Sequence, residues 1–252
     1  MRIWSMVVIA TGSLLLLACD SSGPAGTGRL AFQLAGPSSA AAGAPTFRAG
    51  ADVLTLTTVE IVARKIRLER ADGTCPVEPA TTGPAPSSSE GSDDDEDCPN
   101  VWLAPRILSP PVGPDAIAVF NVDLPEGVYE ELKLQVHKPT GGQADAAAFL
   151  AANPGFANIS VRVVGTFNGT GFTFTSAITA EVEIELDAPI EVTAGQPAAM
   201  TLQIDLASWF AGPGGALLSP LAPSQQVRSQ IEQNIRRSFH AFEDEDRDGD
   251  PD

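Results

Sequence analysis

Carboxylates at alternating positions near the C-terminus are the side chains best suited to chemistry in this sequence. They surround Gly249 in the segment 244–252, DEDRDGDPD, and are Asp244, Asp246, Asp248, Asp250 and Asp252. Calcium prefers several hard oxygen ligands, and a glycine permits the sharp turn that brings alternate side chains together. Any calcium site here would have weak affinity, because the glutamate that completes an EF-hand loop would fall beyond Asp252. We favour a solvated acidic tail, and a weak calcium site formed by these carboxylates is the alternative.

Two other groups of acids are weaker candidates. Residues 93–97 are five consecutive acids, and neighbouring carboxylates in a polar loop repel one another, so we expect a solvated loop there. Glu181, Glu183 and Glu185 alternate with apolar residues and would lie on one side of a strand. This acidic ladder favours a solvent-facing surface, with contact to a cation or a basic partner as the alternative.

The sequence carries little sign of catalysis. Its two histidines are His137, on the polar side of an expected strand, and His240. Neither belongs to a motif such as G-x-S-x-G or H-E-x-x-H. We therefore do not expect an enzyme. A hydrolytic domain with paired acids stays open, because such pairs meet only in the folded chain.

The net charge of −17 is concentrated in two segments. Six acids lie within 90–97 and seven within 243–252. Without these and Arg247, the chain has 19 acidic against 14 basic residues, which is ordinary for a globular domain. We expect no nucleic-acid partner, because no basic stripe is present to neutralise phosphates.

Residues 1–18 have the composition of a secretory signal peptide. Arg2 precedes an apolar stretch, Met6 to Leu17, that is short for a membrane span. Residues 16–19, Leu-Leu-Ala-Cys, resemble the lipobox of bacterial lipoprotein precursors. The resemblance implies cleavage before Cys19, acylation of its sulfur and amine, and export to the periplasmic or cell-surface side of a membrane. Residues 19–28 then form a lipidated tether. An ordinary secretory signal is the alternative.

Two cysteines remain once Cys19 is assigned to lipid. Cys75 and Cys98 bracket a polar, proline-rich segment, and disulfides persist outside the cytoplasm. We expect a disulfide between them, worth roughly 3 kcal/mol through its restriction of the unfolded chain. A metal site is the alternative, but it lacks the further soft ligands that zinc prefers.

Alternating apolar residues predict half-buried strands over most of 29–210. The segment 58–69 changes phase near Arg64, which predicts a β-bulge. Asn168-Gly169 predicts a tight hairpin, because both residues tolerate positive φ. The long run 172–186 is expected to bend between two sheets. The pattern indicates an all-β fold, an antiparallel two-sheet sandwich.

Helix is expected in two places. Residues 144–152 predict a short helix that ends before Asn153-Pro154. After a linker at 211–223, apolar residues recur at helical spacing and predict a C-terminal amphipathic helix over 224–242, with Ser224 as its N-cap and an acidic tail at 243–252. The apolar residues of this stripe are Val227, Ile231, Ile235, Phe239 and Phe242.

Four segments carry a resemblance to a bacterial lipoprotein family, the domain of unknown function 4382. They are 28–30, the paired strand 59–68, the segment 124–129 (LPEGVY) and 192–206. The resemblance implies a prealbumin-like or immunoglobulin-like sandwich in an envelope lipoprotein. It implies no catalytic residues, because the family has no assigned activity.

These observations predict a lipid-anchored cell-envelope protein that acts as a binding or structural module. Its expected partners are a membrane, through the anchor, and an envelope protein or glycan of unknown identity. A carbohydrate-binding or hydrolytic domain, with a site assembled from distant residues, is the alternative.

Overall fold

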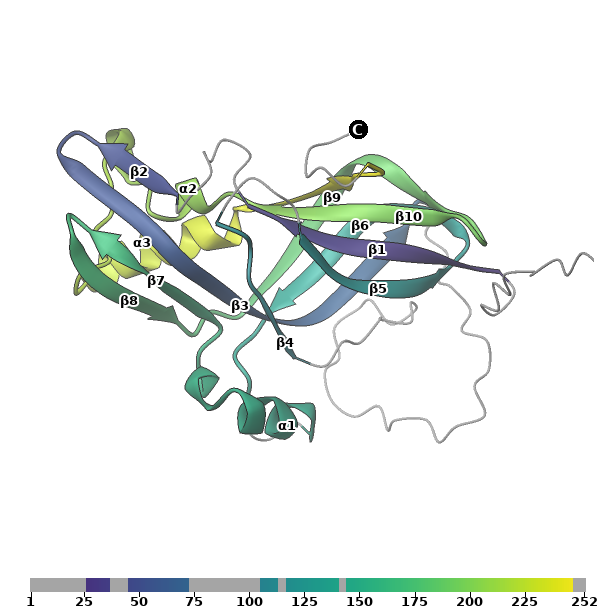
Figure 1. The fold of residues 1–252 in the computed structure, drawn as a ribbon, viewed down its shortest axis with the longest axis horizontal. Coiled ribbons are helices and arrows are strands. Elements are labelled where there is room, and N and C mark those ends of the chain that lie inside the picture. Colours follow the sequence, from purple (N-terminus) through teal and green to yellow (C-terminus); the bar gives the residue numbers. More distant parts are fainter. Residues whose placement is uncertain (1–25, 37–44, 73–104, 113–116, 141–143, 247–252) are drawn as a thin grey trace, which may run out of the picture.

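The structure, a computed structural model, describes residues 26–36, 45–72, 105–112, 117–140 and 144–246. Two β-sheets and a few short helices make up this part of the chain (Figure 1). The elements are β1 (Thr27–Ala35), β2 (Thr46–Ala49), β3 (Asp52–Arg70), β4 (Arg106–Leu108), β5 (Ile117–Pro125), β6 (Gly127–Val136), α1 (Ala144–Ala152), η1 (Pro154–Phe156), β7 (Val161–Phe167), β8 (Thr170–Ser176), β9 (Ala180–Val192), β10 (Pro197–Ile204), α2 (Leu206–Trp209), η2 (Pro213–Gly215), α3 (Gln225–Arg236) and β11 (Phe239–Glu243).

The two sheets confirm the predicted all-β sandwich. The four-stranded sheet has the order β11-β10-β1-β5. The seven-stranded sheet has the order β8-β7-β3-β6-β9, and β2 and β4 also pair with β3. The pairs in both sheets are antiparallel except β1 with β10, which run parallel. The predicted antiparallel sandwich thus contains one parallel pair that the sequence pattern did not predict.

Strand β3 organises the larger sheet. Its core-facing residues are Leu54 and Leu56, then Val59 and Ile61, then Ile66. The phase changes at the two register shifts, between positions 56 and 58 and between positions 63 and 65. Each extra residue returns the same side of the strand to the core. The bulge predicted near Arg64 is confirmed, and a second bulge lies at Thr57.

Strands β6 and β7 lie end to end along one edge of β3. Val62 donates its N–H to the carbonyl of Ser160, and its own carbonyl accepts from the N–H of His137. Both groups of one residue point to the same edge in an antiparallel strand. The larger sheet therefore has two halves, one built on β7 and β8 and the other on β6 and β9.

The two halves have different covers on their core side (Figure 1). The four-stranded sheet covers the β6–β9 half, and Leu30 and Met200 lie opposite Ile66 in the same apolar space. Helices α2 and α3 cover the β7–β8 half. There, the ring of Phe210 packs edge-on against Phe174, with 6.1 Å between centroids.

Helix α3 is fastened to β8 by polar contacts. Arg228 donates to the carbonyl of Thr175 at 2.7 Å, and the hydroxyl of Ser176 donates to Glu232 at 2.7 Å. Ser224 accepts from the N–H of Val227 and confirms the predicted N-cap. These contacts fix the helix on the sheet, where its residues Ile231 and Ile235 are fully buried.

The chain crosses from one sheet to the other within the LPEGVY segment. Glu126 is the single residue between β5 and β6. The hydroxyl of Tyr129 donates back to the carbonyl of Pro125 at 2.8 Å, which holds the corner closed. Gly127 has φ of 158°, and a β-carbon there would lie 2.7 Å from the guanidinium of Arg70. A sharp, crowded corner explains the residue types of this segment.

Several C-terminal boundaries were predicted incorrectly. The helix ends at Arg236, not at 242, and Phe239–Glu243 is strand β11, paired with β10. The helical spacing of Phe239 and Phe242 is a coincidence. Both residues are buried in the core because β11 pairs with β10. The sandwich therefore extends beyond residue 210, and the segment 211–223 leads to a helix inserted between two strands of one sheet.

The run 172–186 was also predicted incorrectly. It does not bend between two sheets, because β8 and β9 both belong to the seven-stranded sheet. The break falls at 177–179, where the chain passes from one half of that sheet to the other. The predicted helix at 144–152 and the Asn168-Gly169 turn, with φ of 50° and 77°, are confirmed.

We predict that Gly165→Ala lowers the free energy of unfolding by more than about 2 kcal/mol, because overpacking against a fixed backbone forces the strands apart. A β-carbon at Gly165 would lie 2.1 Å from the carbonyl oxygen of Thr55 on the paired strand. Urea unfolding measures the effect. The control is Gly171→Ala in the same hairpin, where a β-carbon meets nothing within 4 Å. Equal stability of the two variants would contradict the prediction.

Candidate functional site

The outer side of β3, β6 and β9 carries charged side chains that the strand register brings together. Core-facing residues such as Leu132 and Ile184 alternate with these side chains, which places the charges on the opposite side of the sheet. Arg67 pairs with Lys133, which pairs with Glu183. We call this group the charged face, and its residues are Arg67, Glu69, Glu131, Lys133, Glu181, Glu183 and Glu185.

Lys133 is the centre of the charged face. Its Nζ lies 3.1 Å from Glu69, 3.4 Å from Glu183 and 3.9 Å from Glu131. Arg67 adds a second cation 3.0 Å from the same oxygen of Glu69. The side chain of Lys133 is only 16% exposed. One ammonium group thus holds carboxylates from three adjacent strands.

Glu69 and Glu131 share a proton across the β3–β6 pair. Burial raises the pKa of Glu131, and its hydrogen bond to Glu69 raises it further, to about 7. Burial alone would also raise the pKa of Glu69, but the hydrogen bond from Glu131 and the ammonium of Lys133 outweigh it and lower this pKa. Below about pH 7 the proton therefore stays on Glu131, which in this form donates to the carboxylate of Glu69.

This pair is poorly suited to catalysis. Glycosidases place the sugar bond between two carboxyl groups that stand roughly 5 to 9.5 Å apart, and two carboxyls in mutual hydrogen bond leave no such space. A shared proton is typical of aspartic proteases. Here, however, Lys133 and Arg67 neutralise the carboxylate of Glu69, which would have to act as the base. The arrangement favours a structural or binding role.

The acidic ladder predicted from the sequence forms the exposed margin of the charged face. Glu181, Glu183 and Glu185 are all exposed on β9. Glu183 pairs with Lys133, whereas neither Glu181 nor Glu185 has an ion pair within the described part of the chain. These two carboxylates are available to a cationic group from outside.

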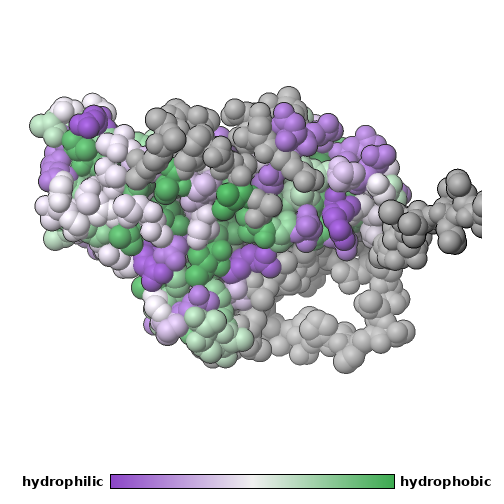
Figure 2. Space-filling model, viewed as in Figure 1, coloured by the Kyte–Doolittle hydropathy of each residue, from purple (hydrophilic) through white to green (hydrophobic). Residues whose placement is uncertain are grey.

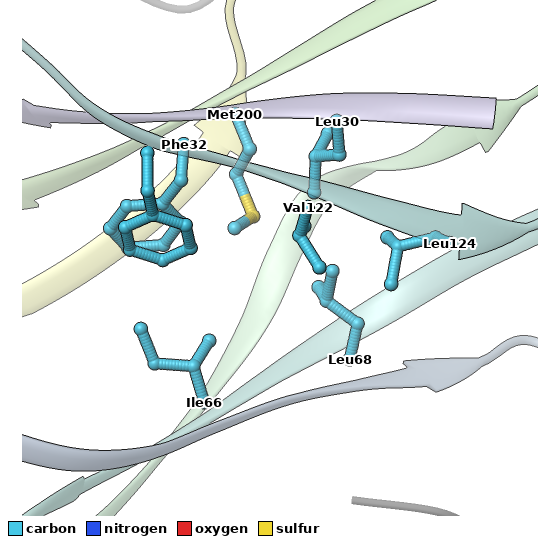
Figure 3. A pocket seen from close by; sticks show the side chains of 8 residues that line it. Leu30, Phe32, Ile66, Leu68, Val122, Leu124 and Met200 are labelled. Carbon is cyan, nitrogen blue, oxygen red and sulfur yellow. The ribbon is translucent and has the colours of Figure 1, made fainter. Parts of the chain in front are cut away.

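The space between the two sheets has a different character. A cavity of about 10 Å³ lies there, and its lining side chains converge from β1, β5 and β10 on one side and from β3 on the other (Figure 3). The lining is Leu30, Phe32, Ile66, Leu68, Phe120, Val122, Leu124 and Met200. This volume is close to that of one water molecule, and an apolar site of this size stays dry. It is a packing gap and offers no group for chemistry.

Most of the residues predicted for lipidation, disulfide formation and metal binding lie outside the described residues. These are Cys19, Cys75, Cys98, Asp248, Asp250 and Asp252, as well as the acidic run 93–97. Their predicted roles stay predictions.

The structure does place the first residue of the predicted calcium loop. Asp244 is fully buried, and the hydroxyl of Thr201 donates to its carboxylate. Its N–H donates to the carbonyl of Ala199, which extends the β10–β11 pairing by one residue. Asp246 is exposed nearby. Within the ranges the structure describes, no three His, Cys, Asp or Glu side chains gather closely enough to hold a metal ion.

Neither histidine belongs to the charged face. His137 follows the last residue of β6, is half-buried and donates its N–H to the carbonyl of Val62. His240 is exposed on β11, opposite Gln203. His137 was expected on the polar side of a strand, and it lies directly after the end of β6.

The Glu69–Glu131 pair was missed by sequence reasoning. Each glutamate only continues the polar phase of its own strand, and more than sixty residues separate them. The register of β3 with β6 makes them neighbours, and that register depends on the bulges on either side. The polar phase of each strand identifies both glutamates as outward-facing residues, but it does not show that they are in contact.

Comparisons with family models, with curated proteins and with solved structures found no match to this chain. The resemblance to the domain of unknown function 4382 therefore stays a prediction. Among the described residues, no helix is both long enough and apolar enough to cross a membrane.

We predict that Glu131→Gln raises the free energy of unfolding at pH 8 by about 1 to 2 kcal/mol and leaves it nearly unchanged at pH 4. The unfolded chain releases this proton near pH 4.5 and the folded chain near pH 7. Stability therefore falls as the pH rises between these values and stays lower above them. Glutamine removes this loss, because its amide donates to Glu69 at every pH.

Denaturant unfolding at several pH values measures this effect. Glu130→Gln is the control, since Glu130 is the exposed neighbour in the same strand. A Glu131→Gln variant that is less stable than the wild type at pH 8, or a control with the same gain, would contradict the shared proton.

Proposed function

We propose that the protein is a lipid-anchored, non-enzymatic binding module of the cell envelope, and that its charged face receives a basic partner. One observation carries the proposal. The charged groups lie on the outer side of a sheet. Lys133 pairs there with Glu69 and Glu183, whereas Glu181 and Glu185 on β9 stay exposed. Charged surfaces of this kind support recognition by electrostatic complementarity rather than chemistry in a pocket.

The position of the N-terminal end supports the anchored arrangement. Strand β1 begins at Thr27, and the carbonyl of Gly26 accepts from the N–H of Glu126 at the sheet-to-sheet corner. The chain from Cys19 to Thr27 spans at most about 27 Å, at roughly 3.4 Å per residue. With lipid on Cys19, this end of the sandwich, where β1 starts in Figure 1, faces the membrane. Val192, at the end of β9, lies beside Gly28 at this same end, and Glu181–Glu185 lie seven to eleven residues before it. The ladder therefore stands away from the membrane and remains open to partners.

Surface apolarity is low over the described residues. Their only large exposed hydrophobic side chains are Ile117 and Val128, at 43% and 42% exposure. On the side shown in Figure 2, apolar residues gather in the middle of the face and have hydrophilic residues on both sides. A carbohydrate site usually needs an exposed aromatic surface, and Trp209 is fully buried. The alternative of a glycan-binding or hydrolytic domain thus gains no support from this part of the chain.

Lipidation is tested on protein isolated from its own envelope. We predict that the mature wild-type protein lacks residues 1–18, carries acyl chains on Cys19 and sediments with membranes. Cys19→Ala moves the protein out of the membrane fraction, because the acyl chains have no attachment site. Ser22→Ala is the control and remains with membranes. Intact mass analysis that finds residues 1–18 still attached, or a free thiol at the mature start, would refute the anchor.

The charged face is tested by the double substitution Glu181→Gln and Glu185→Gln, which spares the ion pair of Lys133. We predict that it weakens binding to the native partner at least tenfold and removes the salt dependence of that binding. A photo-crosslinking residue at position 183 identifies the partner, with position 173 on β8 as the reference. The control Asp187→Asn with Glu191→Gln removes two charges from the same strand. Equal binding by both double variants would exclude the ladder as the contact.

A further inference from the structure

Two hairpin tips meet at the end of the domain away from the start of β1 (Figure 1). One is the β2–β3 turn around Gly50, and the other is the β7–β8 turn, Asn168-Gly169. Asn168 joins them. Its Oδ1 accepts from the N–H of Val53 at 2.8 Å, its Nδ2 donates to Asp52 at 2.9 Å, and its own N–H donates to the carbonyl of Val53 at 2.8 Å. One exposed asparagine therefore makes three hydrogen bonds between the two tips, next to the last paired residues of β3 and β7.

The same residue has the sequence context most prone to deamidation. Asn168-Gly169 is the only Asn-Gly pair in the chain. Glycine has no side chain to hinder its backbone nitrogen, so that this nitrogen can attack the side-chain carbonyl carbon of the asparagine. The attack forms a five-membered imide and expels ammonia. Water then opens the imide to aspartate or to isoaspartate, and no oxidant or other reactant is required.

The native contacts oppose this attack. Both polar atoms of the Asn168 amide are bonded to the neighbouring hairpin, which directs the side chain towards Asp52 and Val53. Rotation towards the nitrogen of Gly169 breaks both bonds. We propose that Asn168 is a deamidation site gated by the contact between the two hairpin tips, and that the reaction separates these tips irreversibly.

The product explains why the tips do not close again. The side chain of aspartate at position 168 has no N–H to donate and faces the carboxylate of Asp52, so the side-chain hydrogen bond is replaced by repulsion between like charges. Isoaspartate also adds a carbon to the backbone of a tight two-residue turn, which disturbs the pairing of the flanking strands. Either product lacks the hydrogen bond from Nδ2 to Asp52 that had helped to protect the asparagine. This inference is independent of the proposed binding function.

The experiment follows deamidation in the full-length protein by peptide mapping and mass spectrometry during incubation at pH 8.5 and 37 °C. The wild type is compared with Asp52→Ala, which removes the acceptor of Nδ2. We expect Asn168 to react several-fold faster in Asp52→Ala than in the wild type, and faster still in wild-type protein unfolded in urea. Asn158 is the internal control, because it is also exposed with positive φ but is followed by Ile159. It should remain unmodified over the same period.

The outcomes decide the proposal. Equal rates at Asn168 in native and unfolded wild-type protein would show that the tips do not gate the reaction, and an unreactive Asn168 in urea would show that it is no deamidation site. This comparison remains valid if Asp52→Ala fails to fold. Hydrogen exchange on Asn168→Asp tests the consequence. We expect faster exchange of the amides of Val53 and position 168 than in the wild type, and unchanged exchange there would overturn the separation of the tips.

Discussion

The structure depends on one requirement, that β3 keeps the same side in the core along nineteen residues. A regular strand keeps one side in the core as long as it runs straight and its pairing stays in register. Strand β3, in contrast, pairs with β7 in its first half and with β6 in its second half. The bulges at Thr57 and Arg64 absorb the mismatch. Each shifts the alternation by one residue, so that Leu56, Ile61 and Ile66 all face inwards.

The same requirement also produces the charged face. When the apolar phase of β3, β6 and β9 faces the core, the polar phases of the three strands must come together outside. Lateral register then decides which charges touch. Lys133 falls between Glu69 and Glu183, and its ammonium offsets part of the repulsion among the glutamates, while the remaining conflict between Glu69 and Glu131 is relieved by a retained proton.

The C-terminal segment completes the core rather than extending from it. Trp209 is fully buried, and its indole N–H donates to the hydroxyl of Ser238 at 2.7 Å, just after α3. Asn234 binds the carbonyls of Trp209 and Ala211 and closes the same connection. The chain thereby returns to the four-stranded sheet, where β11 adds Phe239 and Ala241 to the core. Helix α3 is an insertion between paired strands and belongs to the sandwich.

The sequence by itself determined the local features, because these depend on residues close together in the chain. Alternation predicted the strands and the all-β class, the phase change predicted the bulge at Arg64, and Asn168-Gly169 predicted its turn. Only the tertiary structure decided which strands pair and in what register. It placed Glu131 against Glu69, turned Phe239–Glu243 from helix to strand and set β1 parallel to β10. Those outcomes depend on burial and hydrogen bonds between segments far apart in the chain, and a local pattern of residue types does not contain that information.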